Sequence, residues 1–417
     1  FDYIFVSAQR RRGEMEETMK KKIIIVSHAM FLGGVEKSLL GLLEAFDYTQ
    51  YDVDLFLLRH EGELLEYIPK EVNLLPEVKQ YTVLARPMID TLKEGHILLT
   101  LGRLYGRIKA NKYIKQHHQT DSEVPIDYSH KYTYKLMPFI NKDTNYDLAI
   151  SFLTPHYIVS HKVNAKKKIA WIHTDYGHVE TDIGSQLNMW GSYDYIASIS
   201  QAVTTNFLRN FPQLEDKIIE ILNILPIKLI SKQADEFDVS DEMIDDGSIK
   251  LLSIGRYCEA KNFDNVPFIC KRILESGLNI KWYIIGYGGS EERIKNSIKE
   301  CNMEEHVILL GKKSNPYPYI KACDVYVQPS RYEGKCVSVI EAQSLHKPVI
   351  ITNYSTAKSQ LKDGYDGVIV PLENNECASR MQQIIQDIQL LETMEKNCFN
   401  EDYSKYSEAQ KIYKIIS

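Results

Sequence analysis

The chain has 417 residues, enough for two or three domains at roughly 150 residues per domain. Its 44% hydrophobic and 25% charged residues are an ordinary globular composition, which excludes a disordered or collagen-like chain. The formal net charge of −6 makes nucleic acid an unfavourable partner for the protein as a whole.

Residues 1–20 precede the first expected strand, and we interpret them as a disordered extension or a cloning remnant. Their apolar start, Tyr3–Val6, comes before Arg10–Arg12, which reverses the order found in a secretory signal peptide. The sequence contains no run of about 18 apolar residues, the length that spans a bilayer. We therefore expect neither a signal peptide nor a transmembrane helix.

From Lys21 onward, short apolar runs alternate with helical segments, which predicts a parallel sheet covered by helices on both faces. A glycine-containing loop, Phe31–Gly34, leads from the first strand into a helix over 35–46. The strands expected in this first series are 22–27, 53–58, 146–152, 168–172 and 195–199.

A second series of apolar runs follows the acidic, polar segment Asp235–Gly247, which reads as a linker or exposed loop. Its strands are expected at 250–255, 282–286, 307–311, 325–327, 348–351 and 368–370, with final helices over 373–395 and 403–416. We therefore expect an α/β fold with two Rossmann-like, doubly wound domains facing each other across a cleft. The expected domains are an N-terminal acceptor domain, 21–228, and a C-terminal nucleotide-sugar donor domain, 229–400. A C-terminal helix within 401–417 is expected to pack back on the first domain.

The cysteines are confined to the second half of the chain. All seven lie between Cys258 and Cys398, and none forms a CxxC pair. This distribution favours reduced, buried thiols in a cytoplasmic protein over a disulfide framework or a zinc site.

Residues 91–120 interrupt the alternating pattern and are basic, with six Lys and Arg against Glu94 alone. A helical projection places Arg103 and Arg107 opposite an apolar arc. The arc comprises Ile97, Leu98, Leu101, Leu104, Tyr105 and Ile108. The pattern fails after about Ala110, because Lys112 and Lys115 return to the apolar side.

Two interpretations of residues 91–120 are open. The segment binds an anionic membrane surface or the acceptor through Arg103, Arg107 and Lys109. Alternatively, it is a helix that packs on its own domain and leaves a solvated basic face. Gly102 and Gly106 weaken the helix in either case.

Two carboxylates lie eight residues apart between Pro329 and Ala342: Glu333 on a loop after a strand, and Glu341 in the following helix. Ligands of open α/β sheets bind at the carboxyl ends of the strands. The first N–H groups of the helix, near Cys336–Val339, would face a pyrophosphate. Glu341 could then accept hydrogen bonds from a ribose and Glu333 from a sugar; alternatively, Glu341 is an ordinary helix-surface residue.

Arg256 and Lys261 follow the first strand of the second series, at the sheet edge expected for Glu333. Arginine offers a planar fork to phosphate oxygens, and lysine supplies a compact charge. Two cations and a helix N-terminus would neutralise a nucleoside diphosphate leaving group without a metal. The alternative for either cation is a plain surface charge.

In this order and spacing the motifs resemble those of the family 4 glycosyltransferases, which have the GT-B fold and retain the anomeric configuration. The resemblance runs from about residue 21 to the end and is strongest over 250–370. It implies that Arg256 and Lys261 bind the donor diphosphate, that Glu333 contacts the donor sugar and that Glu341 binds the ribose. Gly255, Gly286 and Gly334 are further donor-binding residues by this resemblance. Lys335, Cys336 and Val337 join the expected donor site because Lys335 adds charge there and the other two lie at the helix start.

Two features of the first half extend the resemblance. Gly33 and Gly34 are similar to the family's first glycine loop, which closes over the donor, where glycine permits a close backbone approach. His173 ends a strand where the family keeps a histidine near the transferred sugar. The resemblance therefore makes His173, Arg256, Lys261 and Glu333 the candidate catalytic residues, with His28, His156 and His178 weaker candidates.

The chain departs from the family at His346, where a glycine is usual, and at Lys335–Cys336, where an aromatic residue or proline is commoner. These departures leave the donor sugar open. Asp52–Asp54 has the form of a DxD metal motif, but it begins a buried-looking strand, so we expect no metal site.

We expect a retaining, metal-independent glycosyltransferase of the hexosyltransferase class, which needs no cofactor. It would move a sugar from a nucleotide diphosphate sugar to a glycan, lipid-linked or cell-envelope polymer acceptor. The expected nucleotide is UDP. The protein would be cytoplasmic and could be peripheral on the inner membrane face, with a hinge near Pro226. The alternatives are a nucleotide-sugar epimerase of the same fold and a catalytically silent partner subunit.

Overall fold

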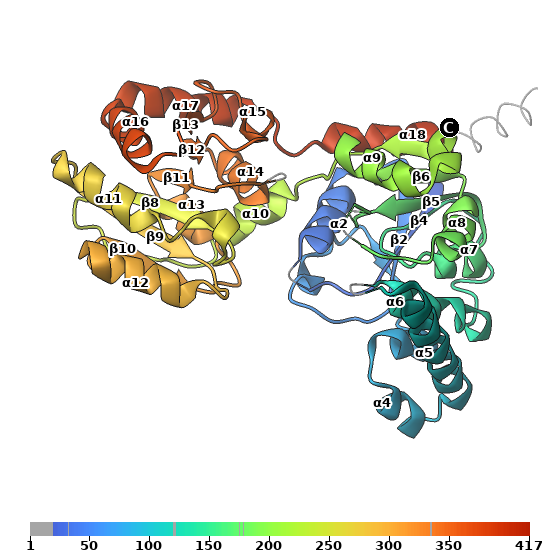
Figure 1. Cartoon of the computed structure of the whole chain (residues 1–417). Helices are drawn as coiled ribbons and strands as arrows, with labels where there is room; N and C mark the ends of the chain where they lie inside the picture. The colour runs from blue at the N-terminus through green and yellow to red at the C-terminus, as the bar shows by residue number, and fades with distance from the viewer. Residues whose placement is uncertain (1–19, 32, 120–121, 175, 178, 334–335) are drawn as a thin grey trace, which may run out of the picture. The chain divides into compact units, whose positions relative to one another are not determined.

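The computed structural model describes residues 20–31, 33–119, 122–174, 176–177, 179–333 and 336–417. The chain forms two compact units (Figure 1). The N-terminal unit contains the described residues up to Leu225 together with Lys405–Ser417, and the C-terminal unit is Pro226–Ser404. The predicted extension 1–20 lies outside the described residues except for Lys20.

The N-terminal unit is built on a parallel seven-stranded sheet in the order β3-β2-β1-β4-β5-β6-β7. Its strands are β1 Lys21–Ser27, β2 Tyr51–Leu57, β3 Asn73–Leu74, β4 Tyr146–Ser151, β5 Ala165–Ile172, β6 Tyr195–Ser198 and β7 Ile218–Glu220. β1 pairs with both β2 and β4, so the strand order reverses there and creates a topological switch point. Burial of β1 on both faces explains its continuous apolar sequence.

Helices cover this sheet, and a further helical group lies at the periphery of the unit (Figure 1). The helices are α2 Gly34–Ala45, α3 Lys79–Thr82, α4 Met88–Lys93, α5 Ile97–His117, α6 Val124–Lys131, α7 Tyr157–Lys162, α8 Ile183–Gly191, α9 Gln201–Asn210 and α18 Ala409–Ile416. The C-terminal helix α18 belongs to this unit, because Tyr413 stacks on Tyr51 with ring centroids 4.4 Å apart and accepts a hydrogen bond from the Asp47 amide.

The C-terminal unit has a parallel six-stranded sheet in the order β10-β9-β8-β11-β12-β13. Its strands are β8 Ile249–Ile254, β9 Ile280–Ile285, β10 Val307–Gly311, β11 Val325–Gln328, β12 Val349–Thr352 and β13 Val368–Val370. Its helices are α10 Ile227–Ala234, α11 Val266–Glu275, α12 Glu291–Cys301, α13 Tyr317–Ala322, α14 Val337–Ser344, α15 Ala357–Gln360, α16 Asn374–Gln386 and α17 Ile388–Asn400. The switch point of this sheet lies between β8 and β11.

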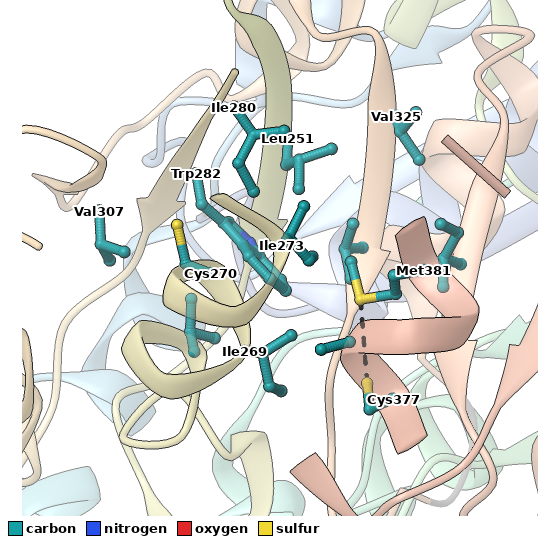
Figure 2. Close-up of a cluster of buried hydrophobic side chains, with 14 of the residues drawn as sticks. Leu251, Ile269, Cys270, Ile273, Ile280, Trp282, Val307, Val325, Cys377 and Met381 are labelled. Carbon is teal, nitrogen blue, oxygen red and sulfur yellow. Dashed lines mark hydrogen bonds between the residues drawn. The ribbon is translucent and has the colours of Figure 1, made fainter. Parts of the chain in front are cut away.

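Apolar side chains from strands and helices interlock beneath this second sheet (Figure 2). Trp282 of β9 is fully buried, and its indole N–H donates to Ser253 Oγ on β8 at 2.9 Å. Cys377 and Met381 of α16 join the same core. All seven cysteines are unpaired thiols, and six of them are buried.

The predicted fold class is confirmed, since both sheets are parallel and doubly wound. The sequence missed the two edge strands β3 and β7, which are only two and three residues long. The helix expected over 373–395 is two helices, because Asp387 ends α16 and caps α17 by accepting a hydrogen bond from the Leu390 amide at 3.0 Å. None of the described helices is both long and apolar enough to cross a bilayer.

Candidate functional site

The predicted cations stand at the carboxyl end of β8, at the switch point of the C-terminal sheet. Gly255 follows β8, and a short 3-10 helix, η5 (Glu259–Lys261), carries Lys261. The Lys261 side chain lies so close to Gly255 that a β-carbon there would approach the lysine Cε to 2.9 Å. The glycine therefore gives the lysine stem room to reach across the strand end.

Lys261 and Glu333 meet directly, although the sequence assigned them to different parts of the donor. Lys261 Nζ donates to Glu333 Oε1 at 2.5 Å, and both side chains are mostly buried. Ser330 Oγ donates to the same oxygen at 2.7 Å, and Cys336 Sγ lies 3.7 Å from the lysine nitrogen. Burial acts to lower the pKa of Lys261, but its neighbours Cys336 and Glu333 outweigh burial and raise that pKa.

The loop that carries Glu333 is fastened to η5 by Arg331, a residue that the sequence analysis did not single out. Its guanidinium binds Asp264 through two hydrogen bonds of 2.9 Å and donates to the Glu259 carbonyl at 2.6 Å. The Arg331 amide donates to the Ala260 carbonyl at 2.8 Å. These bonds fix the lysine and the glutamate in one rigid assembly.

Cys336 caps α14 in a way that changes one prediction. Its amide donates to Gln360 Oε1 at 2.8 Å, so this N–H group is already used inside the domain. Cys336 is 3% exposed, and its sulfur contacts Gln328 and Ser338. Cys336 therefore serves as a packed cap residue and does not supply the N–H group expected for a pyrophosphate, whereas Val337 is exposed at the first turn of α14.

Glu341 is not a helix-surface residue, because its side chain is 4% exposed. Its Oε1 accepts a hydrogen bond from the Tyr317 hydroxyl of α13 at 2.7 Å. Burial, followed by the charge of Glu341, raises the pKa of Tyr317 well above its ordinary value. The tyrosine therefore remains a donor that orients the carboxylate, and only the fold brings these residues together.

The remaining donor-side predictions have mixed outcomes. Arg256 is exposed, at the same strand end as Lys261. Close packing requires glycine at position 286, because a β-carbon there would lie 1.9 Å from the Gly255 carbonyl oxygen. Gly334 and Lys335 lie outside the described residues.

In the N-terminal unit, Gly33 is the N-cap residue of α2 and Gly34 is its first residue. A β-carbon on Gly33 would lie 2.2 Å from Glu36 Oε2, whereas Gly34 has open space around it. His173 follows β5 at the carboxyl edge of the sheet, packed against Phe152 with ring centroids 4.7 Å apart. Burial lowers the pKa of His173 to about 4, so its ring is neutral near pH 7.

Helix α5 packs on its own domain through small residues and not through its apolar arc. Gly106 and Ala110 pack against α6, and Gly102 packs against the residues just after α6. A β-carbon on Gly106 would come within 2.8 Å of the Tyr128 carbonyl oxygen. The apolar arc faces outward, with Leu98 68% exposed and Ile108 58% exposed. The helix therefore packs on its own domain through its small residues and leaves both the apolar arc and the cations Arg107 and Lys109 exposed, so both interpretations of the segment stay open.

The three cations predicted as binding residues in α5 have different surroundings in the structure. Arg103 donates to the carbonyls of Val83 at 2.5 Å and Arg86 at 2.7 Å, so it anchors the helix to its own domain and does not face a partner as predicted. Arg107 and Lys109 are exposed, and the Lys109 ammonium lies 5.4 Å from the centre of the Tyr105 ring.

The C-terminal unit is similar to a known protein family and to several named enzymes. Residues 235–400 match the family model described as glycosyl transferases group 1. The UDP-Gal:α-D-GlcNAc-diphosphoundecaprenol α-1,3-galactosyltransferase of Escherichia coli is 28% identical over 171 residues, which are 40% of this chain and 44% of that protein. An N-acetylgalactosaminyltransferase of Campylobacter jejuni, acting on a diphospho-undecaprenol-linked sugar by its name, is 27% identical over 42% of this chain and 49% of its own length. The chain thus spans less than half the length of these relatives.

Solved structures match over nearly the whole chain. Anabaena HepE in complex with UDP has a TM-score of 0.57 at 16% identity, covering 95% of this chain and 99% of its own. A variant of Staphylococcus aureus TarM, in complex with UDP and α-GlcNAc-glycerol among other ligands, has a TM-score of 0.60 at 15% identity, covering 95% and 100%. At these identities the matches establish a shared fold.

Proposed function

Through residues 235–400 the chain belongs to the group 1, or family 4, glycosyltransferases, and from this premise we propose that it moves a sugar from a UDP-sugar to a glycan, lipid-linked or cell-envelope polymer acceptor with retention of configuration. The observation that carries the proposal is the assembly of Lys261, Glu333 and Glu341 at the switch point of the C-terminal sheet. Relatives named for transfer to diphosphoundecaprenol-linked sugars support the acceptor class.

The proposed mechanism follows from the charges at this strand edge. Arg256, Lys261 and the first turn of α14 stabilise the negative charge that develops as the diphosphate departs. The acceptor hydroxyl attacks on the same face of the sugar, and its proton passes to a leaving phosphate oxygen. Glu333 holds the hydroxyls of the donor sugar, Glu341 binds the ribose, and no metal or cofactor takes part. The transferred group is a hexose or an N-acetylhexosamine.

The test is a thermal-shift screen of UDP- and GDP-sugars, followed by measurement of nucleotide release from the donors that bind. Arg256→Ala and Lys261→Ala should lower turnover by about a hundredfold or more, because each removes charge from the transition state. Lys271→Ala, on an exposed turn of α11, is the matched control. Wild-type rates in both site variants would refute the phosphate assignment, and UDP binding without turnover of any donor would indicate a silent subunit.

A second observation favours a membrane surface as the partner of α5. The outward arc is apolar, and α5 contains no acidic residue between Ile97 and His117. Arg107 and Lys109 flank the arc, and Lys112 and Lys115 lie on the same side of the helix beyond the end of the arc. We propose that this face lies in the interface of an anionic membrane, with its apolar side chains at the acyl boundary and its cations at the headgroups. The protein would then act as a peripheral protein on the cytoplasmic side.

Vesicle co-sedimentation tests this surface. The wild type should bind vesicles of phosphatidylglycerol and phosphatidylcholine more strongly than vesicles of phosphatidylcholine alone. Leu98→Ser/Ile108→Ser and Arg107→Glu/Lys109→Glu should each lower binding by about tenfold. Lys271→Glu/Arg380→Glu, the same charge change on exposed residues of the C-terminal unit, should bind normally. Equal binding by all variants would overturn the proposal, as would concentration-dependent self-association that the Ser variant abolishes.

A further inference from the structure

Two side chains in the segment after β12 hold the main chain around the candidate donor site. Thr356 Oγ1 donates to the Glu333 carbonyl at 2.8 Å. Gln360, the last residue of α15, accepts a hydrogen bond from the Cys336 amide at 2.8 Å and donates one to the Cys336 carbonyl at 3.1 Å. Residues 354–360 are therefore fixed against Glu333 and against the start of α14, although the proposed mechanism gives them no role.

Tyr354, in the same segment, has a buried hydroxyl group that is not used within the described fold. Tyr354 is 2% exposed, and its hydroxyl oxygen has no hydrogen-bond partner among the residues that the structure describes. Burial, followed by the neighbouring Cys336 and Glu333, raises the pKa of Tyr354 above its ordinary value, so the hydroxyl keeps its proton at neutral pH. Buried polar groups are nearly always hydrogen-bonded in native proteins, so this O–H group indicates a ligand atom that accepts a hydrogen bond.

Glu333 offers the complementary group, because its described hydrogen bonds use only one carboxylate oxygen. Lys261 Nζ at 2.5 Å and Ser330 Oγ at 2.7 Å both donate to Oε1. No hydrogen bond from a described residue reaches Oε2, and the side chain is only 13% exposed. Because Glu333 is near enough to shift the pKa of Tyr354, an unpaired acceptor and an unpaired donor lie in the same part of the site.

A hydroxyl group is the ligand that satisfies both residues at once. It donates one hydrogen bond, which Glu333 accepts, and it accepts others, one of which Tyr354 donates. A phosphate oxygen can only accept, and the negative charge of Glu333 would repel it. An apolar group would leave both protein groups unpaired.

We propose that Tyr354 is a specificity residue for the donor: its hydroxyl donates to one hydroxyl of the transferred sugar, and the same sugar hydroxyl donates to Glu333. This assignment rests on the proposed sugar transfer and adds a residue to it. A donor without that hydroxyl would leave two buried groups unpaired, so Tyr354 and Glu333 together select the sugar and not the nucleotide.

Isothermal titration calorimetry on the full chain tests this role without turnover. The probes are UDP, UDP-glucose, UDP-galactose, UDP-N-acetylglucosamine and UDP-N-acetylgalactosamine. Tyr354→Phe removes only the hydroxyl group, so it should raise the Kd of the most tightly bound UDP-sugar by about fivefold or more and leave the Kd of UDP within about twofold. Among the singly deoxygenated forms of that UDP-sugar, one should bind Tyr354→Phe and the wild type alike, because it lacks the hydroxyl that Tyr354 recognises.

Tyr81→Phe is the matched control, because Tyr81 is a fully buried tyrosine of the N-terminal unit whose hydroxyl donates to the Pro138 carbonyl at 2.6 Å. It should bind every probe as the wild type does, but its urea midpoint should fall because the Pro138 carbonyl loses its donor. Tyr354→Phe should keep or raise the urea midpoint of the ligand-free protein, since its hydroxyl has no partner among the described residues.

Three results would overturn the assignment. An unchanged Kd for the UDP-sugar in Tyr354→Phe would show that water satisfies the hydroxyl, and an equal loss of affinity for UDP would place the contact on the nucleotide. A lowered urea midpoint in Tyr354→Phe would give the hydroxyl a role in the fold. The proposed function fails separately, if the wild type binds neither UDP nor any of the four UDP-sugars, and that result would overturn this assignment with it.

Discussion

Lys261 and Glu333 form a mostly buried ion pair in the candidate donor site. Each side chain retains less than a fifth of its exposure, so neither charge can be left alone without a desolvation cost. In the proposed reaction, a diphosphate would replace the carboxylate beside the lysine, and sugar hydroxyls would replace the ammonium beside Glu333. The ion pair would then hold both side chains in place before the proposed donor binds.

A double-mutant cycle measures this coupling. Lys261→Met leaves the carboxylate of Glu333 without its cation and should lower the free energy of unfolding by roughly 2 kcal/mol. The double variant Lys261→Met/Glu333→Gln should recover about half of that loss, because it no longer buries an unpaired charge.

The measurement is urea unfolding at pH 7, with the exposed pair Lys295–Glu291 of α12 as control. The corresponding Lys295→Met and Glu291→Gln changes should couple by less than about 0.5 kcal/mol. Equal coupling in the two pairs would show that burial at the site contributes nothing to the interaction.

At the scale of single elements, the apolar pattern of the sequence was sufficient to locate the buried strands of both sheets, but not the short edge strands β3 and β7 or the packing face of α5. Strands such as β1 and β8 are buried on both faces, so their continuous apolar runs predict central strands of a parallel sheet. The arc of α5 was correctly located but could not be assigned to the core or to the surface. Gly102 and Gly106 determine which face of α5 packs on the domain. In the sequence they only weaken a helix, whereas in the fold their lack of a side chain lets neighbouring backbone approach closely.

Some residues of the candidate site could be predicted from the sequence, and others could be found only in the structure. Gly255, Lys261, Glu333 and Glu341 were identified from motif spacing along one sheet edge. Tyr317 and Arg331 were not, because their roles depend on contacts between segments that are distant in sequence.

Gly106→Ala tests the packing account of α5. In an ordinary helix this change stabilises by about 1 kcal/mol. Here the new methyl group would meet the Tyr128 carbonyl oxygen at 2.8 Å, so we expect a loss of about 1–2 kcal/mol. Gly184→Ala in α8, where the nearest atom is 3.6 Å away, should be neutral or stabilising. Thermal unfolding of both variants checks this, and a more stable Gly106→Ala would contradict the close α5–α6 contact.

At the scale of the whole molecule, the buried histidines with lowered pKa values and the thiols lie in different units. Burial lowers the pKa of His28 and His173 to about 4 and those of His130 and His156 well below the ordinary value, and all four lie in the N-terminal unit. All seven cysteines lie in the C-terminal unit. Acid sensitivity and thiol reactivity therefore report on different halves of the protein.

The N-terminal unit should lose stability first as the pH falls from about 6.5 towards 4. A histidine with a depressed native pKa contributes stability that is complete above its unfolded pKa and is lost as pH falls through its native pKa. Each of His28 and His173 should cost roughly 2 kcal/mol at pH 5 relative to pH 7. Burial raises the pKa of Asp127 to about 6, which acts in the opposite direction and offsets roughly 1 kcal/mol.

Separate probes can follow the two units through this pH range. In a Trp282→Phe variant, the remaining tryptophans Trp171 and Trp190 report only on the N-terminal unit. Thiol labelling of the buried cysteines reports on the C-terminal unit. Between pH 7 and pH 5, the urea midpoint from fluorescence should fall substantially more than the midpoint from thiol labelling. His173→Gln should reduce the fall in fluorescence midpoint, because one buried imidazole no longer takes up a proton on unfolding. Parallel shifts of both midpoints, unchanged by this substitution, would show that the buried histidines do not control the acid response.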